Sequence, residues 1–196
     1  MTTIVTILTD GYADWEAAML NAGARQYYGI TTRFASPGGV PVLSGGGTRV
    51  TPDLAAENID VTAIDALIVN GGTIWSRQDA PDISAILLAA HRAGKTICGI
   101  CDGTIPLARA GLLDAADHTA NAPETLAGTG YGGAGRYKNE PRAVRDGTIV
   151  TAPGVAPVTF MGAVLESLGL RDPDLDFYMG LYAAEHGGAP DRAPVP

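Results

Sequence analysis

The sequence predicts an α/β fold built on a mostly parallel sheet that helices cover on both faces. Two observations predict it. Segments with the apolar, β-branched composition of strands alternate with segments of helical spacing. The strand-like segments are also apolar throughout, as in residues 66–69, which is typical of strands buried on both faces. Ligands bind such sheets beyond the carboxyl ends of the strands, so the turns that follow strands are where function is expected.

The first half of the chain predicts strands, a helix and a hairpin. A β-branched run leads into an acidic turn that contains glycine, and a segment with helical spacing follows. A Ser-Pro-Gly-Gly turn then precedes a short hairpin with three glycines at its tip. In order, the expected elements are strand 3–8, turn 10–14, helix 15–28, strand 31–35, turn 36–39 and hairpin 42–51.

The second half predicts the rest of the sheet and its covering helices. Basic residues followed by Gly94 close one expected helix, and Gly169 closes another. A proline-rich segment at 189–196 is expected to form a loosely held tail. In order, the expected elements are strand 66–69, helix 81–93, strand 96–100, helix 104–113, strand 148–152, helix 157–168 and helix 175–185.

Composition excludes several classes of function. The net charge of −8, without a dense Lys/Arg cluster, argues against a nucleic-acid partner. The chain has no apolar run of membrane-spanning length and no signal-peptide pattern, and its two cysteines are expected to be reduced thiols. These observations predict a cytoplasmic protein without a membrane partner. No residue set has metal-ligand spacing and no phosphate loop occurs, so neither a metal nor another cofactor is expected.

Cys101 marks the most informative turn, because it lies where a predicted strand ends and a predicted helix begins. Free N–H groups at a helix N-terminus stabilise a thiolate, and Gly99 and Gly103 permit the tight turn of a nucleophile elbow. Cys98 precedes it inside the strand and is expected to pack in the core. Two alternatives remain open. Cys101 is a buried structural thiol, or Cys98 and Cys101 form a redox pair of the Cys-x-x-Cys type.

Glu16 follows the first predicted strand, whose carboxyl end meets the elbow at the same edge of the sheet. Apolar neighbours indicate that this side chain is buried, and a buried carboxyl group tends to stay neutral and able to donate a proton. The alternative is a solvated residue in an acidic first turn of the helix. A functional Glu16 is the favoured interpretation.

Four segments together resemble the DJ-1/PfpI superfamily, which is related to class I glutamine amidotransferases. They are Asp14-Trp15-Glu16, Asn70-Gly71-Gly72, the elbow from Gly99 to Gly103, and Thr151-Ala152-Pro153-Gly154. The resemblance covers residues 3–169 and implies a flavodoxin-like three-layer sandwich that forms a homodimer. It assigns residues 1–172 to this domain and 173–196 to a C-terminal helix and tail.

The resemblance also implies roles for individual residues. Cys101 is the reactive thiol, Glu16 its protonated partner, and the backbone N–H groups of Gly72 and Asp102 form an oxyanion hole. The residues expected to contact the substrate are Thr73, Trp75, Asn121 and Pro153. Trp75 has packing as an equal alternative, and His118 is expected to be solvated or structural.

The chain departs from the family pattern where histidines are expected. Asp102 replaces the histidine that follows the cysteine in protease-like members, and Asn121 aligns with a second recurrent histidine. Glu185 and His186 stand in the wrong order for the terminal motif of amidotransferases. Peptidase and glutaminase activities are therefore not expected. The Asp102 side chain either takes part in chemistry or caps the following helix, and both possibilities stay open.

These observations predict a cysteine-dependent enzyme that acts on a small electrophilic substrate, through glyoxalase/deglycase-like or isocyanide-hydratase-like chemistry. Two alternatives come from other classes. One is a redox-sensing or stress-response protein in which Cys101 oxidises reversibly. The other is an amidotransferase-like protein without a complete triad.

Overall fold

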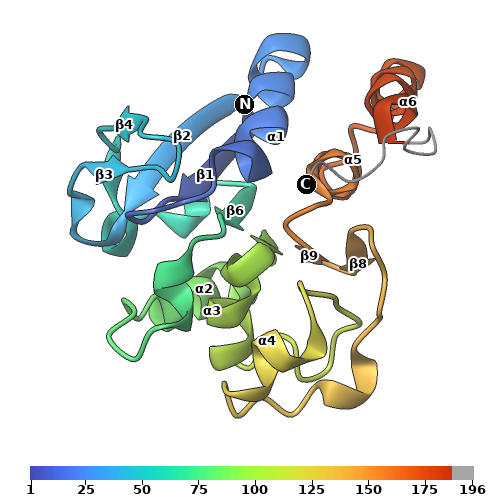
Figure 1. Cartoon of the computed structure of the whole chain (residues 1–196). Coiled ribbons are helices and arrows are strands. Elements are labelled where there is room, and N and C mark those ends of the chain that lie inside the picture. Colours follow the sequence, from blue (N-terminus) through green and yellow to red (C-terminus); the bar gives the residue numbers. More distant parts are fainter. Residues whose placement is uncertain (187–196) are drawn as a thin grey trace, which may run out of the picture.

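A computed structural model describes residues 1–186, and their main sheet has seven strands in the order β5-β2-β1-β6-β7-β9-β8 (Figure 1). Adjacent strands are parallel except for β8, which runs antiparallel to β9. The predicted α/β fold with a mostly parallel sheet is confirmed. Its strands are β1 (Thr3–Ile7), β2 (Thr31–Ser36), β5 (Leu54–Ala55), β6 (Ala66–Val69), β7 (Thr96–Ile100), β8 (Val144–Asp146) and β9 (Ile149–Ala152).

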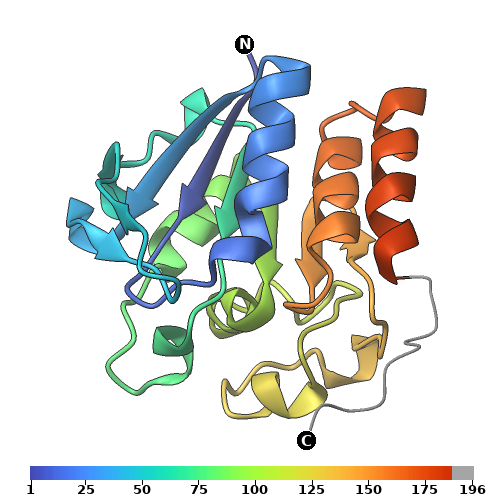
Figure 2. The same ribbon diagram turned by 45° about the horizontal axis from the view of Figure 1, so that its top comes forward.

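Helices cover both faces of this sheet, as the rotated view shows (Figure 2). On one face Leu20 and Phe160, from the first and fifth helices, pack in a buried cluster with Ile68 of β6. On the other face Leu87 and Leu107 pack with Leu67 of the same strand. The helices are α1 (Asp14–Tyr28), α2 (Ser84–Arg92), α3 (Thr104–Arg109), α4 (Pro123–Ala127), α5 (Pro157–Ser167) and α6 (Pro173–His186).

Some predicted boundaries are wrong. Helix α3 ends at Arg109 instead of residue 113, because Gly111 adopts a left-handed backbone with φ +73° and the chain turns there. Helix α2 starts at Ser84 instead of residue 81, because the Asp82 carboxylate accepts the Ser84 N–H and forms a turn before the helix. The elements that the sequence did not predict are the short strands β5 and β8 and helix α4.

The predicted hairpin is confirmed as strands β3 (Val42–Leu43) and β4 (Arg49–Val50), which pair antiparallel. It is joined to the turn that leads into α1. The Leu43 N–H donates to Asp10 at 2.8 Å, and the Gly46 N–H at the tip donates to Asp14 at 2.8 Å. The hairpin therefore supports the segment that carries Glu16.

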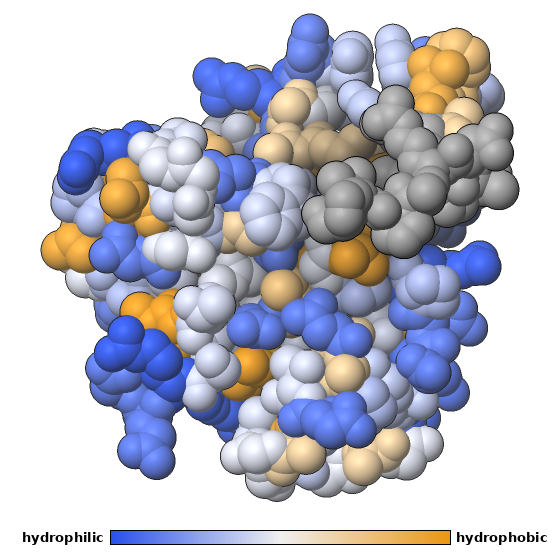
Figure 3. Space-filling view, viewed as in Figure 1, coloured by the Kyte–Doolittle hydropathy of each residue, from blue (hydrophilic) through white to orange (hydrophobic). Residues whose placement is uncertain are grey.

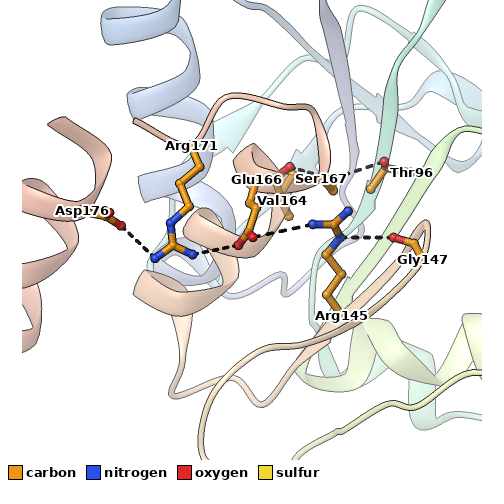
Figure 4. A network of polar contacts seen from close by, with 8 residues as sticks. All are labelled: Thr96, Arg145, Gly147, Val164, Glu166, Ser167, Arg171 and Asp176. Atoms are coloured by element: carbon orange, nitrogen blue, oxygen red, sulfur yellow. Dashed lines mark hydrogen bonds and ion pairs between the residues drawn. The ribbon is translucent and has the colours of Figure 1, made fainter. Parts of the chain in front are cut away.

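Helix α6 confirms the C-terminal helix predicted at 175–185, although the proposed division at residue 172 stays a prediction. Leu175 is buried in the cluster shared by α1 and α5. Charged contacts follow the same junction (Figure 4): Glu166 of α5 contacts Arg145 of β8 and Arg171, which contacts Asp176 of α6.

Apolar residues are visible over α6 on the molecular surface (Figure 3).

No helix in the part of the chain that the structure describes is long and apolar enough to cross a membrane. The predicted tail at 189–196 lies outside the described residues.

Candidate active site

The candidate site lies where the carboxyl ends of four parallel strands meet. Glu16 is in the first turn of α1, which follows β1, and Gly71 comes two residues after β6. Cys101 directly follows β7, and Gly154 comes two residues after β9. Parallel strands bring their carboxyl ends to one edge of the sheet, so four distant segments converge on Cys101.

Cys101 occupies the strained turn that the sequence predicts. Its φ of 57° makes it the one non-glycine residue of the described chain with a positive φ. For a side chain with a Cβ this conformation costs about 1–3 kcal/mol and is concentrated at functional sites. The flanking glycines are needed for space. A Cβ on Gly99 would lie 2.8 Å from the Gly103 carbonyl oxygen, and one on Gly103 would overlap the Val69 carbonyl.

Cys98 is fully buried and packs between the sheet and helices α1 and α5, as predicted. Both cysteines are free thiols. Burial raises the pKa of Cys98 well above its ordinary value, because the charged thiolate is poorly solvated there. The packing interpretation of Cys98 therefore holds over the redox-pair interpretation.

Glu16 is fully buried although it lies in the first turn of a helix. One oxygen, Oε2, accepts the Gly71 N–H at 2.8 Å. The other, Oε1, adjoins Cys101: a Cβ added to Gly154 would lie 3.0 Å from both Glu16 Oε1 and Cys101 Sγ. Burial raises the pKa of Glu16 to about 7, while the neighbouring Cys101 thiol and the hydrogen bond from the Gly71 N–H oppose that rise. The interpretation of Glu16 as a solvated residue is therefore wrong.

Asn121 also contacts the sulfur of Cys101. Its Oδ1 accepts the Gly154 N–H at 2.9 Å, which fixes the orientation of the amide. Its Nδ2 then donates to Cys101 Sγ at 3.1 Å and to Asp102 Oδ1 at 3.2 Å. Asn121 was expected to contact a substrate, and the structure adds a direct contact with the nucleophile.

The thiol pKa corrects one expectation from the sequence. Burial and the nearby Glu16 carboxylate raise the pKa of Cys101 to about 12, against hydrogen bonds from Asn121 and the Asp102 N–H. Helix α3 has only six residues and contributes a small dipole. A thiolate at Cys101 therefore depends on these two hydrogen bonds and on a proton held by Glu16, more than on the helix terminus.

Asp102 is half-buried, and its carboxylate faces Asn121. Burial raises the pKa of Asp102, and the hydrogen bond from Asn121 lowers it in part. Among the described residues, the group that donates a hydrogen bond to the Asp102 carboxylate is the Asn121 amide. No backbone N–H of α3 donates to this carboxylate. The structure therefore does not support the interpretation of Asp102 as a helix cap.

The remaining predicted site residues divide into two groups. The prediction that Trp75 contacts the substrate is wrong. Trp75 is fully buried in the core and its indole N–H donates to the Asn70 carbonyl at 2.8 Å, so it packs instead of lining a pocket. Thr73 is exposed and Pro153 is buried, and their contact with a substrate stays a prediction. Gly72 precedes the 3-10 turn Thr73–Ser76, and its place in an oxyanion hole also stays a prediction.

His118 is structural. It is fully buried, its Nδ1 lies 2.8 Å from the Ala116 carbonyl oxygen, and its ring meets Tyr131 and Tyr137 edge to face. The Tyr137 hydroxyl donates to the Ala120 carbonyl at 3.2 Å. The two tyrosines thus brace the loop that carries Asn121.

Sequence reasoning did not select two residues that complete the site. Gly154 leaves room for the Cys101 sulfur and donates its N–H to Asn121. Trp15 donates its indole N–H to the Gly154 carbonyl at 3.2 Å while 60% of the residue stays exposed. Both stand within the quoted sequence motifs, but their hydrogen bonds join residues 33 and 139 positions apart in the sequence.

Comparison with known proteins assigns this arrangement to a family. The family model described as "DJ-1/PfpI family" matches residues 2–167. The chain belongs to the DJ-1/PfpI family. Within it, the chain is similar in structure to the DJ-1 superfamily protein Atu0886 from Agrobacterium tumefaciens, with a TM-score of 0.92 and 40% identity, covering 95% of this chain and all of that one.

Other DJ-1/PfpI relatives agree with the assignment. A thiJ/pfpI family protein from Bacillus anthracis superposes with a TM-score of 0.80 at 28% identity, covering 94% of this chain and 92% of that one. Two Bacillus subtilis proteins are called uncharacterized proteases. YoaZ is 33% identical over 66% of this chain, and YdeA is 28% identical over 92% of it. The match spans 62% of YoaZ and 91% of YdeA.

Proposed function

We propose that this DJ-1/PfpI chain is a cysteine-dependent enzyme that acts on a small electrophile, with Cys101 as nucleophile and Glu16 as its proton partner. One observation carries the proposal. The sulfur of a cysteine in a strained turn lies between a fully buried carboxyl group and an oriented amide donor. A nucleophile beside an acid–base group, with a third group that orients it, is the arrangement that covalent catalysis requires.

In the proposed first step, Cys101 Sγ forms a bond to an electrophilic carbon. For a carbonyl, the electron pair of the carbon–oxygen π bond moves to the oxygen, which takes a proton from Glu16; for an isocyanide, the proton from Glu16 goes to the attacked carbon and a thioimidate forms. Backbone N–H groups of Gly72 and Asp102 stabilise the developing charge. A carbonyl carbon leads to glyoxalase/deglycase-like chemistry, and an isocyanide carbon leads to isocyanide hydration. Both reactions add one water molecule overall.

The names of the two Bacillus subtilis relatives raise protein cleavage as another activity. A cysteine peptidase uses an imidazole to transfer the proton of the leaving amine. In this chain Asn121 contacts the sulfur, and His118 is enclosed by tyrosines. An amide side chain cannot act as a base, so a small electrophile is the substrate class that the described site favours.

The test compares two cysteine variants, Cys101→Ala and Cys98→Ala. Turnover of methylglyoxal and of an aryl isocyanide is measured for both, alongside thermal unfolding. We expect Cys101→Ala to lose at least about 100-fold in kcat/KM and Cys98→Ala to keep its activity where it stays folded. Full turnover by folded Cys101→Ala rules the proposal out.

A redox-sensing role would use the same thiol and is separated by mild peroxide treatment. Intact mass then reports oxygen uptake for the wild type and for each cysteine variant. Selective oxidation at Cys101, without turnover of either electrophile, would replace the enzymatic proposal with the sensor.

We extend the proposal to a homodimer. Three large apolar residues on α6 are substantially exposed: Phe177, Leu181 and Tyr182. Exposed apolar patches of this kind occur at protein interfaces. Light scattering coupled to size exclusion is expected to give twice the chain mass of 20.1 kDa, and a mass of one chain would contradict the extension.

A further inference from the structure

Asp102 has a feature that the proposed function leaves unused: its carboxylate shares a single amide group with the nucleophile. Asn121 Nδ2 lies 3.1 Å from Cys101 Sγ and 3.2 Å from Asp102 Oδ1. The orientation of this amide is fixed, because Oδ1 of Asn121 already accepts the Gly154 N–H. The Asp102 carboxylate is therefore held beside the sulfur by a defined contact.

The two carboxyl groups at the site differ in depth. Glu16 is fully buried, with Oε2 committed to the Gly71 N–H. Asp102 is half-buried and directly follows the nucleophile in the chain. A water molecule that attacks a covalent adduct on Cys101 arrives from solvent, and of the two carboxyl groups Asp102 is the one with solvent exposure.

Apart from Glu16, which acts in the first step, Asp102 is the acid–base side chain that the described residues bring to this site. The charged or titratable groups that influence the pKa values of Glu16, Cys101 and Asp102 are members of this trio, and no lysine, arginine or histidine is among them. His118, the histidine nearest in sequence to Asn121, is bonded to Ala116 and enclosed by tyrosines.

We propose that the Asp102 side chain is the general base that activates water to release the covalent adduct from Cys101, an inference that rests on the proposed function. The water oxygen forms a bond to the adduct carbon, and its proton goes to Asp102. The carbon–sulfur bond breaks, and its electron pair returns to Sγ. The proton on Asp102 then returns, directly or through solvent, to Glu16, which gave one up in the first step, so the net change is the addition of one water.

The raised pKa of Asp102 suits this role, because a stronger base accepts a proton from water more readily. The carboxylate must be ionised to act. Release of the adduct should therefore slow as pH falls through the pKa of Asp102, which is higher than that of an ordinary aspartate.

The test uses p-nitrophenyl acetate, which separates the two chemical steps. Attack by Cys101 releases nitrophenolate in a burst, and water then removes the acetyl group in the steady state. The proteins are wild type, Cys101→Ala, Asp102→Asn, Asp102→Ala and the control Asp79→Asn, which changes an exposed aspartate that pairs with Arg77.

For Asp102→Asn we expect a burst of undiminished amplitude, a steady-state rate lower by about 100-fold, and acetyl-enzyme that accumulates in intact mass spectra. In Asp102→Ala, added formate should restore deacetylation, which a purely structural role does not explain. The inference is overturned if Asp102→Asn has the same steady-state rate and pH dependence as the wild type and formate does not rescue Asp102→Ala. Absence of a burst in the wild type, or an equal burst in Cys101→Ala, instead overturns the proposed function. Thermal unfolding identifies a variant that is not folded. The folded variant then decides, through the steady-state rate and pH dependence of Asp102→Asn or through formate rescue of Asp102→Ala.

Discussion

At the residue scale, the site places three acids together: Glu16, Cys101 and Asp102. The pKa of each is raised, mainly because burial disfavours the charged form. A negative charge on Asp102 also raises the pKa of Glu16, and a negative charge on Glu16 raises the pKa of Cys101. The site therefore holds protons that exposed carboxyl groups would release, and proton transfer within the trio is coupled to the charge on the sulfur.

Glu16 gives this coupling a measurable effect on stability. Its pKa rises from 4.5 to about 7 on folding, so the folded chain keeps a proton that the unfolded chain has lost. The contribution of Glu16 to stability should fall by roughly 3 kcal/mol as pH rises from about 4.5 to 7, and stay level above that range. Glu16→Gln removes the titration and keeps an acceptor for the Gly71 N–H.

Urea unfolding at pH 4.5 and pH 8 checks this prediction in wild type, Glu16→Gln and the exposed control Glu124→Gln. The wild type and the control should lose stability relative to Glu16→Gln at the higher pH. Equal pH dependence in all three proteins would contradict a raised pKa at Glu16.

At the element scale, the loop between α3 and α4 determines where Asn121 stands. The Thr119 N–H donates to Thr151 Oγ1 of β9 at 2.8 Å, and the Lys138 N–H donates to the His118 carbonyl at 2.7 Å. His118 itself lies between two tyrosine rings. A loop without regular secondary structure is thus fixed to the sheet two residues before the residue that contacts the nucleophile.

Thr151 tests this attachment, because it is fully buried and its hydroxyl accepts the Thr119 N–H. Thr151→Val leaves that N–H without a partner and should lower the free energy of unfolding by about 1–3 kcal/mol. Thr151→Val should also lower the rate at which Cys101 is alkylated. Thr151→Ser keeps the hydroxyl and should keep the wild-type alkylation rate. Urea titration and iodoacetamide kinetics measure the two effects, and equal behaviour of both variants would refute the attachment.

The elements and the elbow were predictable because their signals are local. The apolar run of β7 and its flanking glycines indicate a turn at Cys101, and the position of Cys98 within the strand indicates burial. Asp102 and Trp75 show the limit, since whether a side chain caps, packs or faces a pocket depends on partners far along the chain. The Gly154 and Trp15 contacts were missed for the same reason.

At the scale of the whole molecule, α6 extends the layer formed by α1 and α5. Tyr27 of α1 stacks on Tyr178 of α6 with ring centroids 4.8 Å apart, and Leu175 is 3% exposed. The ion pairs of Arg171 at the same junction are substantially exposed. Apolar packing therefore holds the helix, since exposed ion pairs contribute little.

This difference predicts unequal effects of two substitutions. Leu175→Ala should lower the free energy of unfolding by about 2–5 kcal/mol, whereas Arg171→Ala should lower it by less than about 1 kcal/mol. Denaturant unfolding gives both values, and limited proteolysis should cut Leu175→Ala first near α6. A larger loss from Arg171→Ala would show that the ion pairs dominate.

The hydrogen bond from Trp15 to Gly154 has an optical consequence. The chain has two tryptophans: Trp15, which faces solvent while bonded to the loop that touches Asn121 and Cys101, and Trp75, which is sealed in the core. Indole emission depends on solvent contact and hydrogen bonding, so an adduct that displaces the Gly154 loop changes Trp15 fluorescence and leaves Trp75 as a constant background. Trp15 emission is therefore expected to report occupancy of Cys101 in real time without a label.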